Sequence, residues 1–284
     1  MLLASNNFNP YLVSSTINIS FVKDIDDSYP YRMAYQNNQG RIVSLDCTEE
    51  TIDITTPQSF HFCVENIVSF YWVNNHEDIK VLLHVNNTEV LVKYWYLHIL
   101  LPIFYSLNGK YNFLHTGSVL IDKQPILFMA QSFGGKSTIT DYFLQKGHTL
   151  ITDDKLATFD NNGEFMAVPS IPFHRPYRKV EDFGIYVENF ATKAYKINII
   201  YQLNKVDADA NITFNEVRGL EKFSFLHKGS EMNFGFNMKN HVPYLSKLAN
   251  KVKLFKIDMP WNLNRQEEVY QSILEHLKKV QNET

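Results

Sequence analysis

The stretch Ala130 to Ser137 constrains this chain most, because it has the sequence AQSFGGKS and lies between an apolar run and a helical pattern. Its last three residues, Gly135-Lys136-Ser137, match the final fixed positions of the phosphate-binding loop G-x-x-x-x-G-K-[ST]. Such a loop wraps closely around phosphate oxygens, so Cβ atoms are unwelcome and successive N–H groups point inward. The sequence therefore predicts a phosphate site, with a chance Gly-Gly turn as the alternative.

Each position of this loop has an expected role. Lys136 would neutralise the β and γ oxygens of ATP, and the Ser137 hydroxyl would bind Mg²⁺. Ala130 stands where the motif has its first glycine, and alanine fits there only if its φ is negative. The residues expected to contact the cofactor are Ser132, Phe133, Gly134, Gly135, Lys136, Ser137 and Thr138.

An acidic pair, Asp153-Asp154, follows the loop closely, since Asp154 comes 17 residues after Ser137. Between them the pattern predicts a helix over Lys136 to Lys146, ended by Gly147, and a buried strand over Thr149 to Thr152. We expect a right-handed βαβ crossover, which brings the loop and the pair to one sheet edge. One carboxylate would hold Mg²⁺ and the other would accept the proton of an attacking hydroxyl. A solvated Asp-Asp turn is the alternative.

The rest of the chain predicts an α/β protein in two parts. Residues 1–108 are β-rich and end in an apolar helix over Leu91 to Leu107, and the turn Asn108-Gly109-Lys110 separates them from residues 109–284. The predicted strands are Ser14 to Val22, Ile42 to Leu45, Ile52 to Ile54, Val81 to Val85, Ser118 to Ile121, Pro125 to Met129, Ile197 to Leu203 and Val252 to Ile257. The further predicted helices are Val242 to Ala249 and Asn264 to Val280.

Composition excludes several classes of function. The net charge of −3 gives no electrostatic reason to expect a nucleic-acid partner. Leu91 to Leu107 contains Lys93 and Pro102 and is short for a membrane span. We therefore expect a buried helix instead of a membrane span, and no membrane partner. Two cysteines without a CxxC pair indicate neither a disulfide framework nor a zinc site, and the start of the chain lacks a secretory signal. We therefore expect a cytoplasmic protein.

Four segments taken in order resemble one known family. These are Leu114-His115-Thr116-Gly117-Ser118-Val119, the loop, Lys146-Gly147-His148 and Leu150-Ile151-Thr152-Asp153-Asp154. Together they are similar to the core of the HPr serine kinase C-terminal domain family, which shares its fold with phosphoenolpyruvate carboxykinase. More weakly, the whole chain resembles the HPr-kinase-like proteins encoded in lasso-peptide and other modified-peptide gene clusters.

The resemblance implies a PEP carboxykinase-like P-loop kinase domain that transfers the γ-phosphoryl group of ATP to a serine hydroxyl of a peptide. It assigns Asp153 as general base, Asp154 as a carboxylate on the metal side and His115 as the histidine beside the phosphates. Two departures from the family are Ala130 and the segment Glu216 to Leu220, which only echoes the signature E-V-R-G-L-G and lies much farther from the acidic pair.

Other residues carry weaker indications. The segment Pro172 to Lys179 is rich in cations, and Arg175 or Arg178 could stabilise the transition-state charge or grip an acidic substrate. A solvated basic loop is the alternative. We expect the core or a domain interface to contain the aromatic residues Tyr94, Trp95, Tyr96, Phe104, Tyr105 and Trp261.

These observations favour a kinase that uses ATP and Mg²⁺ and acts on a hydroxyl of a peptide, protein or small molecule. The expected catalytic residues are Asp153, Lys136, His115 and Arg175, with Ser137 and Asp154 on the metal. A nucleotide-binding regulatory module without transfer is the alternative, motivated by Ala130 and the displaced glutamate segment. Carboxykinase chemistry is disfavoured because the chain is short and has no evident arginine set, and homo-oligomer formation is left open.

Overall fold

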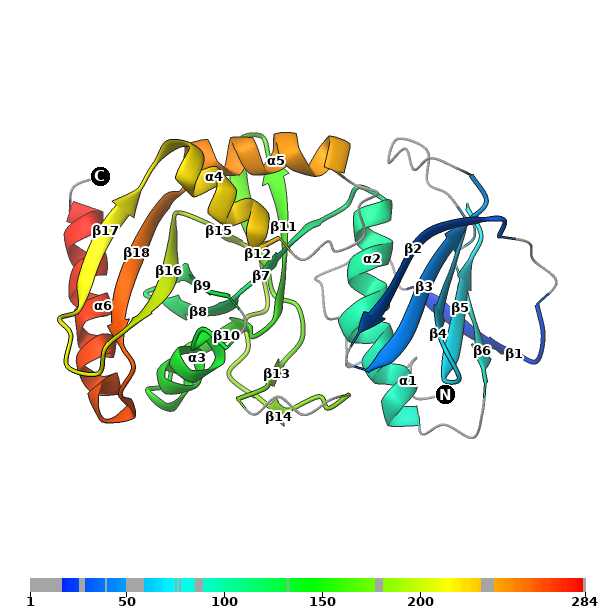
Figure 1. The fold of residues 1–284 in the computed structure, drawn as a ribbon, viewed down its shortest axis with the longest axis horizontal. Coiled ribbons are helices and arrows are strands. Elements are labelled where there is room, and N and C mark those ends of the chain that lie inside the picture. The colour runs from blue at the N-terminus through cyan, green and yellow to red at the C-terminus, as the bar shows by residue number, and fades with distance from the viewer. Residues whose placement is uncertain are drawn as a thin grey trace. The chain divides into compact units, whose positions relative to one another are not determined.

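The computed structural model of the chain describes residues 17–25, 29–38, 40–49, 59–74, 76, 78–84, 89–131, 133–176, 181–230 and 238–282. The chain divides into two compact units (Figure 1). The first contains Met1–Phe113, Arg178–Phe183 and Met232–Val242, and the second contains Leu114–Tyr177, Gly184–Glu231 and Pro243–Thr284.

The first unit contains a six-stranded sheet in the order β1-β6-β5-β4-β3-β2, in which only the pair β1 and β6 is parallel. Alternating burial along β4 shows that one face of the sheet is packed. The strand prediction over 42–45 is confirmed, and the one over 81–85 is confirmed at 81–83, whereas the one over 52–54 lies outside the described residues. The strands are β1 Asn18–Val22, β2 Tyr31–Asn38, β3 Arg41–Cys47, β4 Phe60–Val64, β5 Val68–Trp72 and β6 Asp78–Leu83.

A helical segment follows, formed by α1 Glu89–Trp95, the π-helical turn Tyr96–Leu100 and α2 Leu101–Leu107. In it, Phe104 packs edge-on against Phe60 and Trp72 of the sheet. Val90–Leu107 is long and apolar enough to cross a membrane, but 78% of it is buried inside the protein. This burial confirms the predicted buried helix. Its aromatic residues belong to the core as expected: Phe104 contacts the sheet, and four others are almost fully buried, namely Tyr94, Trp95, Tyr96 and Tyr105.

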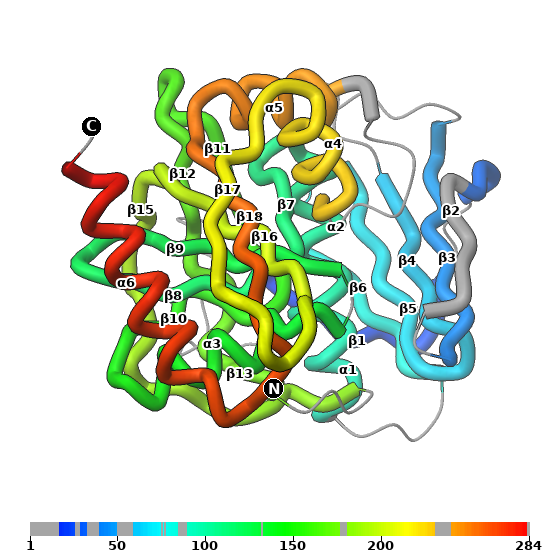
Figure 2. Tube along the Cα trace, turned by 60° about the vertical axis from the view of Figure 1, so that its left-hand side comes forward, coloured from blue at the N-terminus to red at the C-terminus, as the bar shows by residue number. Residues whose placement is uncertain are grey.

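The second unit is built on a six-stranded sheet in the order β10-β8-β9-β16-β18-β17. Strands β9, β16 and β18 run parallel, so their carboxyl ends lie at one edge. In Figure 2, β16, β18 and β17 run side by side. The strands are β8 Gly117–Ile121, β9 Gln124–Met129, β10 Thr149–Thr152, β16 Ile199–Val206, β17 Thr213–Val217 and β18 Lys253–Pro260.

Helices cover both faces of this sheet, because residues alternate between two cores along each strand. One core joins α3 Lys136–Gln145 and the terminal helix α6 Gln266–Asn282 to residues such as Phe128 and Tyr201. The other joins α4 Gly219–Lys228 and α5 Met238–Lys251 to neighbouring strand residues. A second sheet, in the order β15-β12-β11-β7, contributes to this second core, with strands β7 Asn112–His115, β11 Lys155–Asn161, β12 Glu164–Val168 and β15 Tyr195–Lys196. Two short strands, β13 Phe173–His174 and β14 Ile185–Tyr186, form a separate pair.

The expected βαβ crossover β9–α3–β10 joins two strands of one sheet that are not neighbours. β8 lies between them and pairs antiparallel with β10. The hairpin β8–β9 has already occupied that side of β9 through its two-residue turn. Because β10 is antiparallel to β8, and β8 is antiparallel to β9, β10 still runs in the direction of β9. The acidic pair therefore follows a strand whose carboxyl end lies at the same edge as the loop.

Replacing Ile273 with alanine will destabilise the protein. Ile273 is fully buried on α6, where it packs among the side chains of α3 and the central sheet. The lost methyl groups leave a cavity, so the free energy of unfolding should fall by about 2 to 5 kcal/mol in urea titrations. The control is Lys278→Ala, which replaces an exposed residue of the same helix. An unchanged midpoint for Ile273→Ala would show that α6 does not pack on this sheet.

Candidate functional site

The phosphate-binding loop connects the carboxyl end of β9 to the first residue of α3, Lys136. Gly135 has φ +91°, which favours glycine, and a Cβ there would lie 3.0 Å from the Met259 methyl group. A Cβ on Gly134 would lie 2.4 Å from the Ala130 Cβ and 2.7 Å from the Gln131 carbonyl oxygen. The loop backbone is therefore closed tightly enough to exclude side chains at both glycines.

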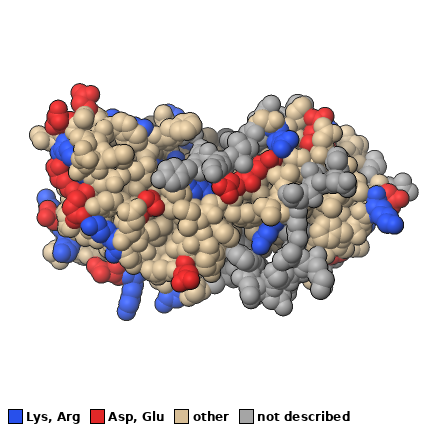
Figure 3. Space-filling view, turned by 90° about the horizontal axis from the view of Figure 1, so that it is seen from below, with Lys and Arg blue, Asp and Glu red and all other residues tan. Residues whose placement is uncertain are grey.

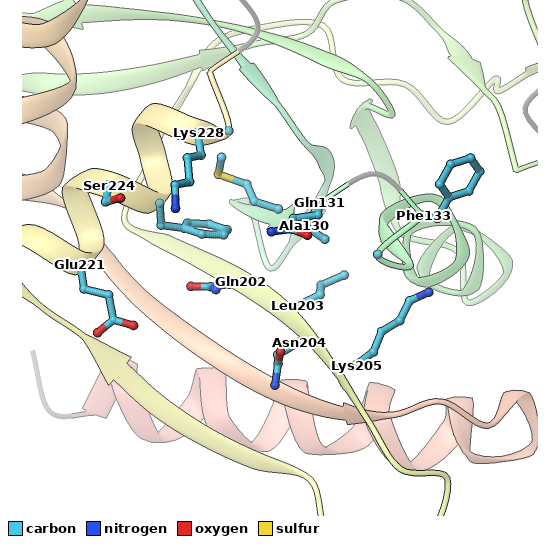
Figure 4. A pocket seen from close by; sticks show the side chains of 14 residues that line it. Ala130, Gln131, Phe133, Gln202, Leu203, Asn204, Lys205, Glu221, Ser224 and Lys228 are labelled. Carbon is cyan, nitrogen blue, oxygen red and sulfur yellow. The ribbon is translucent and has the colours of Figure 1, made fainter.

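Ala130 is absent from the described residues with positive φ, which confirms the condition for alanine in place of glycine. Instead, Phe133 takes the left-handed conformation, with φ +61°. Its side chain is 80% exposed and points away from the neighbouring cavity (Figure 4). For a non-glycine residue this conformation costs roughly 1 to 2 kcal/mol, which the loop closure must offset. Ser132 lies outside the described residues.

Lys136 is only 5% exposed, and its Nζ donates a hydrogen bond to the Ala130 carbonyl oxygen at 2.9 Å. The ammonium group therefore reaches back across the loop instead of extending into solvent. Ser137 and Thr138 occupy the first turn of α3 and are partly exposed. The first turn of a helix carries N–H groups without intrahelical partners, and these favour an anion.

Asp153 is 5% exposed and strongly held on one side. Its Oδ2 accepts a hydrogen bond from the Arg175 backbone N–H at 2.6 Å and lies 2.9 Å from His174 Nδ1. Its Oδ1 is buried and has no hydrogen-bond partner among the described residues. Burial without a partner costs a carboxylate oxygen free energy, so this atom is suited to a ligand or a proton that arrives later.

Asp154 is more accessible and has different partners. Its Oδ1 lies 3.1 Å from His115 Nδ1, and its Oδ2 lies 3.6 Å from Arg175 Nη1. Burial raises the pKa of this carboxyl group, but the hydrogen bond to His115 and the nearby cations outweigh it and lower the pKa far below its ordinary value. Asp154 is thus held as an anion at neutral pH, which a metal ligand requires.

His174 was not among the residues predicted from the sequence. It lies in β13, where Nδ1 faces Asp153 and Nε2 lies 3.0 Å from Asp141 Oδ1 on α3. Burial lowers its pKa, but the hydrogen bonds and charges of the two carboxylates prevail and raise it above the ordinary value. The His174 ring therefore joins the acidic pair to the helix that begins at the loop.

The loop and the acidic pair are also joined through β8. The Thr116 N–H donates to the Asp154 carbonyl oxygen at 3.0 Å. A Cβ on the next residue, Gly117, would lie 2.1 Å from Thr140 Oγ1 and 3.4 Å from the Lys136 carbonyl oxygen. Glycine at this position lets β8 approach the start of α3, and so all the predicted catalytic residues lie around one edge of the sheet. Within the described residues, no group of three His, Cys, Asp or Glu side chains could hold a metal ion by itself.

A cavity of about 590 Å³ adjoins the loop on the side of α4. Its walls come from the loop, from Gln202 to Lys205 of β16 and from α4, and Figure 4 shows Lys205 extending from β16 toward the loop. Lys228 and Glu221 add charge, and Gln202 Oε1 is buried without a hydrogen-bond partner among the described residues. A volume of this size suits a small molecule or a short peptide segment.

On the face shown in Figure 3, Lys and Arg side chains are interspersed with Asp and Glu side chains.

Comparisons with known proteins add little. No family model matches the chain. No curated protein matches it by sequence. Among solved structures, the chain is similar to the HPr(Ser) kinase/phosphatase from Coxiella burnetii, with 13% identity and a TM-score of 0.36 over 60% of this chain and 93% of that one. The function proposed below therefore rests on the residues and contacts of this chain.

The unfolding free energy should depend on pH through His174. Because the pKa of His174 is raised in the folded state, its protonation stabilises the fold. This contribution is fully present at a pH below the ordinary pKa of 6.5 and is lost as the pH rises through the pKa of the folded state. Urea titrations of the ligand-free protein between about pH 6 and pH 9 should show a fall in stability that is smaller in His174→Gln. The control is His76→Gln, which replaces an exposed histidine and should show the same fall in stability as the wild type. Equal slopes in wild type and His174→Gln would contradict the ion pairs.

Proposed function

We propose that the chain is a kinase that uses Mg-ATP and transfers the γ-phosphoryl group to a hydroxyl group, with the serine of a peptide or protein as the leading acceptor. The observation that carries this proposal is the position of the buried, unpartnered Asp153 Oδ1 at the same sheet edge as a glycine loop closed around Lys136. A loop alone would support nucleotide binding, and an acidic pair alone would support a metal site. Together they provide the two requirements of phosphoryl transfer, namely positioning and charge neutralisation.

The residues fit ATP and Mg²⁺ by two observations of this chain. The glycines at 134 and 135 allow a closed loop in which a Cβ would meet the loop itself or Met259, and successive N–H groups of such a loop can contact phosphate oxygens. Asp154 is kept anionic by His115 and Arg175, and Mg²⁺ is commonly held by one or two carboxylates together with phosphate oxygens. Bound Mg²⁺ would neutralise charge on the phosphates, with Ser137 and Asp154 as its protein ligands.

The protein residues have separate roles in this proposal. Lys136 leaves the Ala130 carbonyl group and neutralises phosphate oxygens, and the first-turn N–H groups of α3, including that of Thr138, orient the phosphates. Asp153 Oδ1 accepts the proton of the acceptor hydroxyl, while the Arg175 N–H and His174 keep the carboxylate in position. The Arg175 guanidinium group and His115, both beside Asp154, stabilise the negative charge that develops on the phosphate oxygens during transfer.

We infer that the acceptor approaches through the cavity of about 590 Å³. Gly229 lines this cavity, and its carbonyl oxygen accepts a hydrogen bond from the N–H of His115, whose ring contacts Asp154, so one wall of the cavity is bonded to the segment beside the acidic pair. Polar and charged walls suit a peptide better than an apolar metabolite.

The free thiols of Cys47 and Cys63 are consistent with a reducing compartment, and we propose the cytoplasm.

Two substitutions should separate binding from transfer. Lys136→Ala should weaken Mg-ATP binding about ten- to a hundredfold, since hydrogen bonds to charged groups contribute roughly 1.5 to 3 kcal/mol. Asp153→Asn should bind Mg-ATP normally but lower the transfer rate by about 10² to 10⁴. Calorimetry measures the first effect, and mass spectrometry of serine peptides incubated with Mg-ATP measures the second.

The matched control is Lys146→Ala, which removes a lysine from the far end of the same helix, where it forms an exposed ion pair with Glu267. Both its binding and its transfer should remain close to those of the wild type. Full activity in Lys136→Ala or Asp153→Asn would refute the proposed roles. Tight Mg-ATP binding without transfer to any hydroxyl acceptor would instead identify a nucleotide-responsive module.

A further inference from the structure

A second hollow borders the loop on the opposite side from α4. This groove of about 300 Å³ is lined mainly by apolar side chains from the end of β18 and from the connection to α6, including Met259, Trp261 and Leu263. Gly135 and Thr138 of the loop form its other wall. The groove is therefore continuous with the residues expected to hold phosphates, although none of its apolar residues was predicted to have a function.

Trp261 was expected in the core or an interface, but it is not a core residue, because half of its surface is exposed. Its position is nevertheless well defined. Its backbone N–H donates to the Val206 carbonyl oxygen at 3.1 Å, and Lys205 Nζ lies 3.3 Å from the centre of its ring. The ring edge also faces the loop, since a Cβ on Gly135 would lie 3.3 Å from it. Lys205 thus covers one face of the ring, while half of the side chain remains exposed beside the loop.

The order of the strands decides which part of a nucleotide could reach the groove. Across the sheet the order is β10-β8-β9-β16-β18, so the acidic pair after β10 and Trp261 after β18 lie on opposite sides of the loop after β9. The γ-phosphate must face the acidic pair for transfer to occur. The other end of the nucleotide then extends away from Asp153, toward Thr138 and the groove.

We propose that this groove binds the base of the nucleoside triphosphate, with Trp261 as the stacking platform and a purine as the preferred base. A purine has a planar apolar face, which suits Trp261, Met259 and Leu263, and a polar edge, which suits the amide groups of Asn262 and Gln266 at the groove. The larger ring system of a purine stacks over more of the indole than a pyrimidine does. The proposal rests on the proposed function, because the phosphates of the same molecule must occupy the loop.

The test compares Mg-ATP with magnesium tripolyphosphate, which carries the phosphates without the base. Trp261→Ala should weaken Mg-ATP binding about five- to a hundredfold in calorimetry, because stacking of one base on an aromatic side chain contributes roughly 1 to 3 kcal/mol. Tripolyphosphate binding should stay unchanged. Trp261→Phe should retain most of the affinity for Mg-ATP, and the wild type should bind Mg-ATP more tightly than Mg-CTP.

A matched pair of leucines provides the control. Leu263 lies in the groove and is 70% exposed, whereas Leu220 lies at the start of α4 and is 87% exposed. Leu263→Ala should weaken Mg-ATP binding severalfold, and Leu220→Ala should not. Equal losses for Mg-ATP and tripolyphosphate in Trp261→Ala, or no loss for either, would overturn the base site. Equal wild-type affinities for Mg-ATP and Mg-CTP would overturn the purine preference.

The outcomes also separate this inference from the proposed function. If the wild type binds both ligands and Lys136→Ala weakens both, the phosphate site stands, and indifference to Trp261→Ala then refutes the base site alone. If the wild type binds neither ligand, or Lys136→Ala changes nothing, the phosphate site fails and the base site fails with it.

Discussion

The arrangement of the second unit depends on how two adjacent carboxylates are accommodated at the end of one strand. Two neighbouring carboxylates such as Asp153 and Asp154 repel each other if both are charged and share the same surroundings. Here they are directed to different partners: Asp153 to His174, and Asp154 to His115. Arg175 serves both, through its backbone N–H for Asp153 and its guanidinium group for Asp154. These contacts give each carboxylate its own set of partners and so fix its position at the edge.

These ion pairs also explain why elements far apart in the sequence meet at this edge. His115 ends β7, His174 belongs to β13, and Asp141 lies on α3, five residues after Lys136. The bond between His174 and Asp141 ties the acidic pair to the helix whose first turn faces the phosphates. The loop itself stores strain at Phe133, and such strain persists only where the surrounding structure determines the backbone. The tightly packed Ala130 and Gly134, together with Lys136 bonded across the loop, supply that determination.

Much of this edge could be predicted from sequence because its information is local. The loop, α3 with its Gly147 cap at φ +89°, and β10 follow from residue types at short spacing. The pairing of β10 with β8 could not be predicted, because a crossover of this length fits an adjacent or a more distant strand equally well. His174 lies 20 residues from Asp154, and nothing in its neighbourhood indicated that it would face Asp153. The hairpin β11–β12 was missed although Asn162-Gly163, both with positive φ, is a strong local turn signal.

The parallel strands divide the surroundings of the loop into two chemically different regions. Residues of β16 and β18 alternate between the two cores, so their carboxyl ends carry neighbouring side chains to opposite faces of the sheet. The α4 side therefore receives the polar cavity, with Gln202 and Lys228, while the α6 side receives the apolar groove with Trp261. Lys205 lies between them, lining the cavity and covering the Trp261 ring. The acceptor in the cavity and the base in the groove would therefore be recognised by different faces of one sheet, with the phosphates at the loop between them.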